Sequence, residues 1–318
     1  MSGSGASAPP PTRREIVAGI RAELEAGGVE AAAMEAERLA CFALGIERHA
    51  LVTEGPAPID PGSLHLLGRL VRRRLGGEPL QHIEGTTAFR DLLLVADSRA
   101  LVPRPETEQL VDLVGEWVRE RARGGGGGDG VRVVRRDPGA GHAFEPVDLA
   151  LDVGTGSGAI ALSLVHEGIA RAAVGVDVSA AALTQAEENR ARCALKGAVD
   201  LRLVPPSIWE GVGPEERFQV IVSNPPYVRD DEMAGLAADV REHEPAVALR
   251  GGADGLEIVR RVIEGAPPHL APGGALFLEI GPEQGARVLA WLAEGVWRDV
   301  VLRQDYAGRA RFVVARAP

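Results

Sequence analysis

The chain has 318 residues, enough for two domains with separate cores, and its 45% hydrophobic and 25% charged residues are typical of a globular protein. Its net charge of −10 argues against a nucleic-acid-binding surface, which usually needs basic side chains to neutralise phosphates. Two cysteines without a CxxC pair and seven scattered histidines predict neither a disulfide framework nor a metal site.

The first segment, residues 1–12, is mostly Gly, Ser, Ala and Pro. It predicts a disordered tail rather than a signal peptide, because it has no apolar core. No apolar run in the chain approaches the length of a membrane span. We therefore expect a cytoplasmic protein without a membrane partner.

Residues 13–85 show helical periodicity and predict a small bundle without catalytic groups of its own. The apolar positions that carry this pattern are Ile16, Val17, Ile20 and Leu24, then Met34, Leu39, Phe42 and Leu44, then Leu64, Leu67, Leu70, Val71 and Leu75. Each set ends at a glycine. The run Arg72 to Arg74 is either a docking patch or a solvated helix face, and the second interpretation is favoured.

Residues 86–103 change to short apolar runs, Thr87 to Phe89 and Leu92 to Val95, which predict a hairpin-like connector. Prolines and acids from Pro103 to Glu108 then mark the start of a helix. Glycines 124–128 and 130 predict a disordered insertion at about 123–144.

From residue 147 onward, strand and helix patterns alternate to the end of the chain. Such alternation predicts an α/β domain over residues 104–318, with a doubly wound, mainly parallel Rossmann-like sheet. The first predicted strand is Val147 to Val153, and the run Phe218 to Val222 is another buried strand.

A glycine-rich loop, Gly154-Thr155-Gly156-Ser157-Gly158, joins the first of these strands to a helix. Glycines let the backbone approach a ligand closely, and the helix behind them offers free N–H groups. Asp177 follows about 20 residues later at the end of the next strand, where dinucleotide folds place the acid that binds a ribose. The ordered set predicts a nucleotide-type cofactor site.

A second motif, Asn224-Pro225-Pro226-Tyr227, follows the strand Phe218 to Val222 at the edge where open α/β sheets bind ligands. The prolines rigidify the loop and leave carbonyls that only accept hydrogen bonds. Such a rim suits a planar NH2 group: Asn224 Oδ1 and the Pro225 carbonyl would accept its hydrogens, and Tyr227 would pack on it. By itself, the motif could equally be a plain Asn-Pro turn.

Together, the two motifs resemble those of S-adenosylmethionine-dependent methyltransferases of the amino-methylating branch, in which a Gly-x-Gly-x-Gly loop replaces the dinucleotide Gly-x-Gly-x-x-Gly. This resemblance implies S-adenosylmethionine as cofactor and no metal. The chemistry serves adenine, cytosine and glutamine alike, so the motif alone does not select the substrate.

Further stretches resemble the peptide chain release factor N5-glutamine methyltransferase family along the whole chain. They are Gly77 to Ile83, Val102 to Glu108, Glu244 to Leu256 and Asp305 to Arg311. The resemblance implies methyl transfer to the N5 amide of the glutamine in the Gly-Gly-Gln motif of release factors. Because residues 13–85 carry no catalytic groups, we expect them to dock the protein substrate.

The same resemblance assigns the site residues. Gly154 to Gly158 and Asp177 would hold the cofactor, with Trp209 near its adenine. Asn224 would contact both cofactor and substrate, and Pro225, Pro226 and Tyr227 the substrate glutamine. Asn224, Pro225 and Tyr227 would form the catalytic set. Ile208 stands where the family usually has an acid.

Three alternatives remain open. Sister enzymes methylate a glutamine in a ribosomal protein, but they usually differ after Pro103-Arg104, so Pro105 to Glu108 favours release factors. A nucleic-acid amino methyltransferase, acting on adenine N6 or guanine N2, is disfavoured by the acidic charge. A catalytically idle cofactor-binding scaffold is disfavoured by the intact Asn224 to Tyr227 motif.

Overall fold

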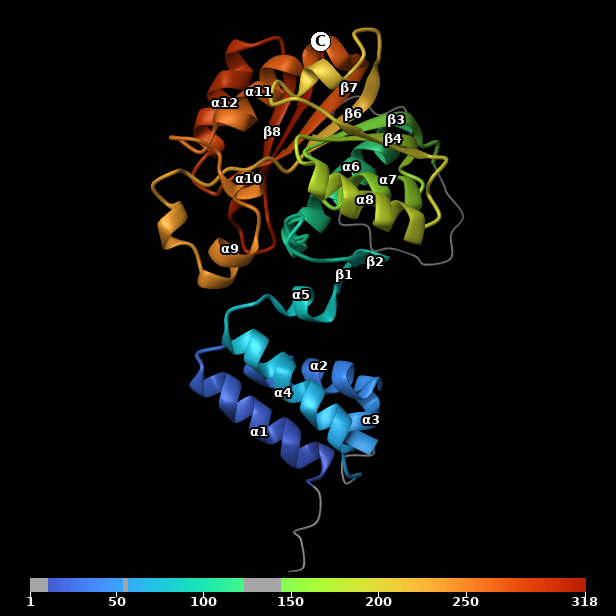
Figure 1. Cartoon of the computed structure of the whole chain (residues 1–318). Helices are drawn as coiled ribbons and strands as arrows, with labels where there is room; N and C mark the ends of the chain where they lie inside the picture. Colours follow the sequence, from blue (N-terminus) through green and yellow to red (C-terminus); the bar gives the residue numbers. More distant parts are fainter. Residues whose placement is uncertain (1–10, 54–56, 123–143) are drawn as a thin grey trace, which may run out of the picture. The chain divides into compact units, whose positions relative to one another are not determined.

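The computed structural model describes residues 11–53, 57–122 and 144–318, so most of the predicted tail and insertion lie outside the described residues. The chain divides into two compact units (Figure 1). One contains the described residues up to Gly85 together with Ala238–His243, and the other contains Thr86–Ala237 and Glu244–Pro318.

The first unit is helical. Its helices are α1 (Arg13–Ala26), α2 (Ala32–Leu44), α3 (Arg48–Thr53), α4 (Pro61–Leu75), α5 (Leu80–Glu84) and α9 (Ala238–His243). Local signals explain the boundaries: Thr12 caps α1 in a capping box, Asp60 caps α4, and Gly45 ends α2 in a left-handed conformation with φ 64°. Leu24, Leu39 and Leu67 lie in the common core.

The arginine run of this unit is largely used within it. Arg73 pairs with Glu78 at 2.6 Å, and Arg74 pairs with Glu35 at 2.5 Å across α2 and α4. Arg74 is half-buried in its ion pair, whereas Arg72 and Arg73 lie on the exposed side of the helix, as expected for a solvated helix face.

The second unit begins with a hairpin of β1 (Thr86–Phe89) and β2 (Leu92–Val95) and continues into a seven-stranded sheet of order β5-β4-β3-β6-β7-β9-β8. Its strands are β3 (Val147–Val153), β4 (Ala170–Asp177), β5 (Val199–Leu203), β6 (Phe218–Ser223), β7 (Leu270–Glu279), β8 (Arg298–Gln304) and β9 (Ala310–Arg316). The first five are parallel, and β9 runs antiparallel to both β7 and β8.

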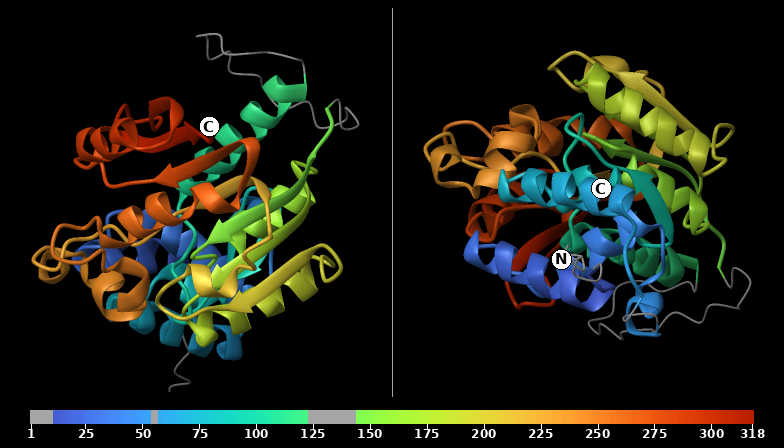
Figure 2. Two further views of the ribbon diagram at one scale, coloured as in Figure 1. Left: turned by 90° about the horizontal axis from the view of Figure 1, so that it is seen from above. Right: turned by 60° about the horizontal axis from the view of Figure 1, so that its bottom comes forward.

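Helices cover both faces of this sheet (Figure 1; Figure 2). They are α6 (Pro105–Ala122), α7 (Ala159–His166), α8 (Ala180–Arg192), α11 (Glu257–Gly265) and α12 (Gly285–Glu294). The unit also contains the short helix α10 (Ala246–Leu249) and the 3-10 turns η1 (Trp209–Gly211), η2 (Met233–Gly235) and η3 (Pro267–His269). Successive side chains of β6 point to opposite faces of the sheet. Val220 and Val222 pack in the core beneath α6 and α7, whereas Ile221 packs in the core beneath α11 and α12.

The sheet reverses its strand order between β3 and β6, which are adjacent although β4 and β5 lie between them in sequence. Ser223 Oγ donates to the Val153 carbonyl at 2.7 Å and ties the carboxyl ends of these strands together. Open α/β sheets bind ligands at such a switch point. Among the described helices, none is both long and apolar enough to cross a membrane.

Candidate active site

A cavity of about 420 Å³ opens at the carboxyl ends of β3, β4 and β6. Of the residues that the sequence predicts for the site, those that line it are Gly154, Thr155, Gly156, Ser157, Asp177, Asn224, Pro225 and Pro226. The structure thus brings the glycine loop, the strand-end acid and the Asn-Pro-Pro rim to one place. Gly158, Trp209 and Tyr227 are not part of the cavity wall.

The glycine loop needs glycine because of its backbone. Gly154, Gly156 and Gly158 have φ of 74°, 56° and 83°, in the left-handed region that other residues rarely adopt. Gly158 is the N-cap residue of α7, so the loop delivers the chain into a helix N-terminus next to the cavity.

Asp177 lies beside this loop at the end of β4. Its Oδ2 accepts a hydrogen bond from the Gly156 N–H at 2.8 Å, and its Oδ1 accepts from the Ser179 N–H at 2.8 Å. Burial raises the pKa of this carboxyl, and the backbone N–H groups act in the opposite direction. The acid is therefore held rigidly at the cavity wall, where each oxygen can still accept from a ligand hydroxyl.

Asp152, which the sequence analysis did not single out, lies directly before the loop and is fully buried. Its Oδ2 accepts from Thr155 Oγ1 at 2.7 Å and from the Ala161 N–H at 3.1 Å. Its Oδ1 has no hydrogen-bond partner among the described residues. Burial, with a further contribution from Asp177, raises the pKa of Asp152 to about 7. The sequence signal that could have pointed to Asp152 is its position near the end of a predicted strand, just before the three glycines of the loop.

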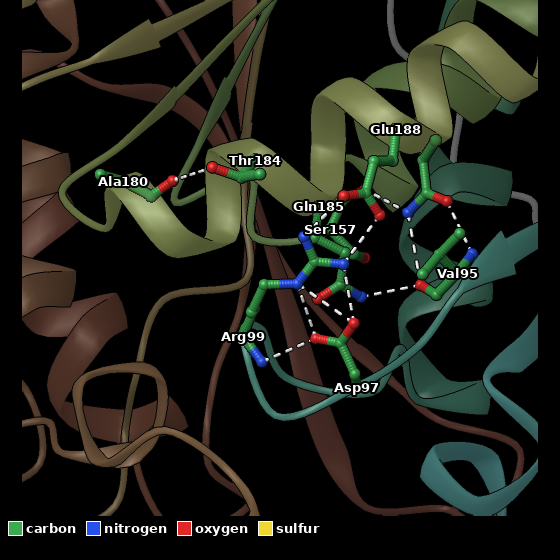
Figure 3. Close-up of polar contacts among 9 residues, drawn as sticks. Val95, Asp97, Arg99, Ser157, Ala180, Thr184, Gln185 and Glu188 are labelled. Atoms are coloured by element: carbon green, nitrogen blue, oxygen red, sulfur yellow. Dashed lines mark hydrogen bonds and ion pairs between the residues drawn. The ribbon is translucent and has the colours of Figure 1, made fainter.

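The segment after β2 forms one wall of the cavity, which is lined there by Arg99, Ala100, Leu101 and Pro103. The sequence did not predict this wall. Figure 3 shows Arg99 between Asp97 and Glu188. Its Nη2 bonds Asp97 Oδ2 at 2.7 Å and Glu188 Oε2 at 2.8 Å, which anchors the connector to α8. No motif marks these residues, because their role depends on contacts across 89 positions.

Asn224 lies at the rim with its side-chain amide oriented by α6. Its Nδ2 donates to Thr107 Oγ1 at 3.0 Å, and Thr107 belongs to the first turn of that helix and also lines the cavity. The contact uses a donor of the amide and leaves Oδ1 as an acceptor. Pro225 is buried beside it, and neither proline has an N–H that could compete.

Known proteins resemble the chain over both units. Residues 15–85 match the family described as the PrmC N-terminal domain, and residues 144–241 match the methyltransferase small domain. A release factor glutamine methyltransferase of Cereibacter sphaeroides is 37% identical over 93% of this chain and 95% of its own length. The enzyme of that name from Geobacter sulfurreducens is 35% identical, with 96% of each chain covered. The chain belongs to the release factor glutamine methyltransferase family.

The family extends beyond bacteria. The human MTRF1L release factor glutamine methyltransferase is 33% identical over 95% of this chain and 86% of its own length. As a member of a methyltransferase family, the chain needs a methyl donor, and the cavity is the place in the second unit where the predicted cofactor and substrate residues meet.

Trp209 and Tyr227 both have predicted roles in this release factor glutamine methyltransferase, but neither lines the cavity. Trp209 donates from Nε1 to the Arg261 carbonyl at 3.0 Å and stacks on His269, with ring centroids 5.1 Å apart and an interplanar angle of 4°. Its neighbour Ile208 lines the cavity instead.

The backbone explains this exchange. Ile208 has φ 60° and ψ −54°, and the Trp209 N–H donates to the Ser207 carbonyl at 2.6 Å, which closes a γ-turn around Ile208. A β-branched residue is strained there. The turn directs Ile208 into the cavity wall and Trp209 toward η3.

Tyr227 is largely buried. Its hydroxyl accepts from Arg311 Nη2 at 3.0 Å, and the Arg311 guanidinium lies 5.1 Å from its ring centre. Burial raises the pKa of this phenol, and the nearby Glu279 carboxylate contributes in the same direction. The ring is therefore engaged with β9, and its predicted packing against the substrate stays a prediction. In the described part of the chain, no group of three or more His, Cys, Asp or Glu side chains could hold a metal.

Proposed function

We propose that this enzyme transfers a methyl group from S-adenosylmethionine to the N5 side-chain amide of the glutamine in the Gly-Gly-Gln motif of a peptide chain release factor. The observation that carries the proposal is the meeting of the glycine loop, Asp177 and the Asn224 rim around one cavity. The names of the relatives support the choice of release factors over other amide or amine substrates.

The cavity residues fit S-adenosylmethionine. Asp177 offers carboxylate oxygens for ribose hydroxyls, and the glycine loop permits close backbone approach. When bound, the cofactor supplies an electrophilic methyl group on a sulfonium. Ile208 adds an apolar contact at the wall where the family usually has an acid.

The substrate side of the cavity must help a poor nucleophile. An amide NH2 shares its lone pair with the carbonyl π system, so it attacks only when it is well placed and polarised. Asn224 Oδ1 and the Pro225 carbonyl would accept hydrogen bonds from its two N–H groups and stabilise the positive charge that develops on nitrogen. The N–C bond would form as the C–S bond of the sulfonium breaks and a neutral thioether leaves, and the nitrogen would then lose one proton to solvent. No metal is required for this step.

The protein substrate would dock on the helical unit, because residues 13–85 contain no catalytic constellation. A release-factor substrate also places the enzyme in the cytoplasm, where translation terminates. The net charge of −10 disfavours direct binding to nucleic acid.

The decisive experiment offers the enzyme four acceptors with labelled S-adenosylmethionine: a purified release factor, the same factor with the Gly-Gly-Gln glutamine changed to glutamate, a mixture of ribosomal proteins, and bulk nucleic acid. We expect label only on the unchanged factor, located by peptide mass spectrometry on the glutamine amide. Label on ribosomal protein or nucleic acid in preference to the factor would overturn the proposal.

Docking on the helical unit has a separate test. Met34 and Phe42 on α2 are both 45% exposed, so serine at both positions removes apolar surface without touching the core. We expect the double variant to raise KM for the intact factor but not for a short glutamine peptide. Serine at Val296, which is 54% exposed in the other unit, is the matched control. An unchanged KM for the intact factor would show that docking uses another surface.

A further inference from the structure

A chain of buried side chains lies behind Asn224 and joins four elements of the second unit. Thr107 of α6 contacts Asn224, and Thr107 Oγ1 donates to Glu279 Oε2 at 2.8 Å. Glu279, the last residue of β7, is completely buried, and its Oε1 accepts from Arg311 Nη2 of β9 at 2.8 Å. The same Arg311 Nη2 donates to the Tyr227 hydroxyl at 3.0 Å.

The chemistry of these groups gives the hydrogen bonds one direction. Burial raises the pKa of Glu279, but the Arg311 guanidinium beside it acts in the opposite direction and favours the carboxylate. An ionised carboxylate accepts only, and the guanidinium of Arg311 donates only, so Glu279 accepts from Thr107. The single proton of the Thr107 hydroxyl is donated to Glu279, so the Thr107 oxygen can only accept a hydrogen bond from the amide of Asn224. The NH2 end of that amide therefore faces Thr107, and its carbonyl end is left for a ligand.

Burying such a charged pair is costly, which makes its position informative. Arg311 and Glu279 have side chains that are 9% and 0% exposed, and a buried ion pair often contributes no more stability than apolar residues of similar size. The pair lies two hydrogen bonds away from the residue that would contact the substrate amide. An apolar pair in place of Glu279 and Arg311 could not direct the Thr107 proton, so it could not orient Asn224.

We propose that Thr107, with its proton directed by the Glu279–Arg311 pair, is a positioning residue that fixes the amide orientation of Asn224 for methyl transfer. This inference rests on the proposed function of the cavity. If the amide turned over, its NH2 group would face the NH2 group of the substrate, and two donors would meet where a donor and an acceptor are needed. The Tyr227 hydroxyl joins the same assembly through Arg311.

The test compares Thr107→Val, which keeps the shape but removes the hydroxyl, with Thr107→Ser, which keeps the hydroxyl. Misplacement of a catalytic group typically costs about 10²-fold in rate. We therefore expect Thr107→Val to lower kcat about 10²-fold with little change in KM for the factor, and Thr107→Ser to retain most of the activity. Thr87→Val is the matched control, since Thr87 is buried in β1 and its hydroxyl donates to the neighbouring Ala88 carbonyl at 3.4 Å, with no other side-chain hydrogen bond among the described residues.

A double-variant cycle separates positioning from general structural damage. If Thr107 acts through Asn224, Thr107→Val has nothing left to position in an Asn224→Ala background, and the two changes together should be no slower than Asn224→Ala alone. Equal fold-losses from Thr107→Val in both backgrounds would overturn the positioning role, as would a Thr107→Val variant with normal turnover. An inactive wild-type enzyme on release factor would instead overturn the proposed function.

Discussion

Asn189 of α8 donates from Nδ2 to the backbone carbonyl of Ser157 at 3.0 Å, so a completely buried side chain on a helix holds the glycine loop in place. The Oδ1 atom of the same side chain accepts from the Val95 N–H at 2.6 Å. One amide therefore ties the loop after β3 to the end of β2, the strand from which the chain continues into the cavity wall at Arg99. The glycine loop has no regular secondary structure that would hold it there.

Asn189→Ala is expected to lower the free energy of unfolding by about 1–3 kcal/mol, because it leaves buried backbone groups of Ser157 and Val95 without their partner. Cofactor affinity should fall as well, since the loop loses its tether. Denaturant unfolding and calorimetric titration with S-adenosylmethionine measure the two effects. Arg192→Ala, on the exposed side of the same helix, should change stability by less than about 0.5 kcal/mol. Unchanged cofactor affinity in Asn189→Ala would show that the loop holds its own shape.

Features with a strong local signal were predictable from the sequence. The predicted strand Val147–Val153 coincides with β3, and the predicted strand Phe218–Val222 falls within β6, because an apolar run marks each of them. The cavity-lining part of the glycine loop and the Asn-Pro-Pro rim were also found, since strand ends in a parallel sheet share one edge.

What depends on tertiary contacts was missed. Met34 and Phe42 helped to predict α2, yet both are exposed, because the buried face of that helix is formed largely by small residues such as Ala36 and Ala40. Thr107 and Glu279 are 172 positions apart, so no spacing in the sequence links them. Trp209, which the family resemblance puts near the adenine, stacks on His269 and does not line the cavity, and its contact with the cofactor stays a prediction.

The role of Asp177 is tested by two substitutions. Asp177→Ala is expected to weaken cofactor binding by about 1–3 kcal/mol, since it removes the acceptor for ribose hydroxyls and also frees the Gly156 N–H. Asp177→Asn keeps one oxygen and should lose less. Calorimetry with S-adenosylmethionine measures both. Equal affinity in wild type and Asp177→Ala would remove this acid from the cofactor site.

Asp152 predicts an unusual pH dependence of stability. Its folded-state pKa of about 7 lies above the ordinary value near 4, so between these pH values the folded chain binds more protons than the unfolded chain. The contribution of Asp152 to the free energy of unfolding should therefore fall as the pH rises from about 4 to 7 and level off above that range.

Asp152→Asn should remove this component, because an amide oxygen can still accept from Thr155 and Ala161 but does not ionise. Denaturant unfolding at several pH values, with the cofactor absent, gives the comparison. The stability difference between variant and wild type should grow with pH in favour of the variant. A difference that is constant across this range would mean that Asp152 is already ionised at pH 4.

Asn224 is the residue on which turnover should depend most. Asn224→Ala removes one of the two acceptors for the substrate amide, and loss of one such preorganised partner typically costs about 10²–10³-fold in kcat. The fold should survive, because Pro225 and Pro226 still fix the loop.

Asn224→Asp is the sharper comparison. It keeps an acceptor toward the substrate but turns the Nδ2 donor into a second acceptor, so two carboxylates, Asp at 224 and Glu279, compete for the single proton of Thr107. We expect Asp to retain more activity than Ala and less than wild type, as measured by single-turnover methyl transfer to the release factor. Near-normal rates in both variants would mean that backbone carbonyls alone polarise the amide and that Asn224 serves only the turn.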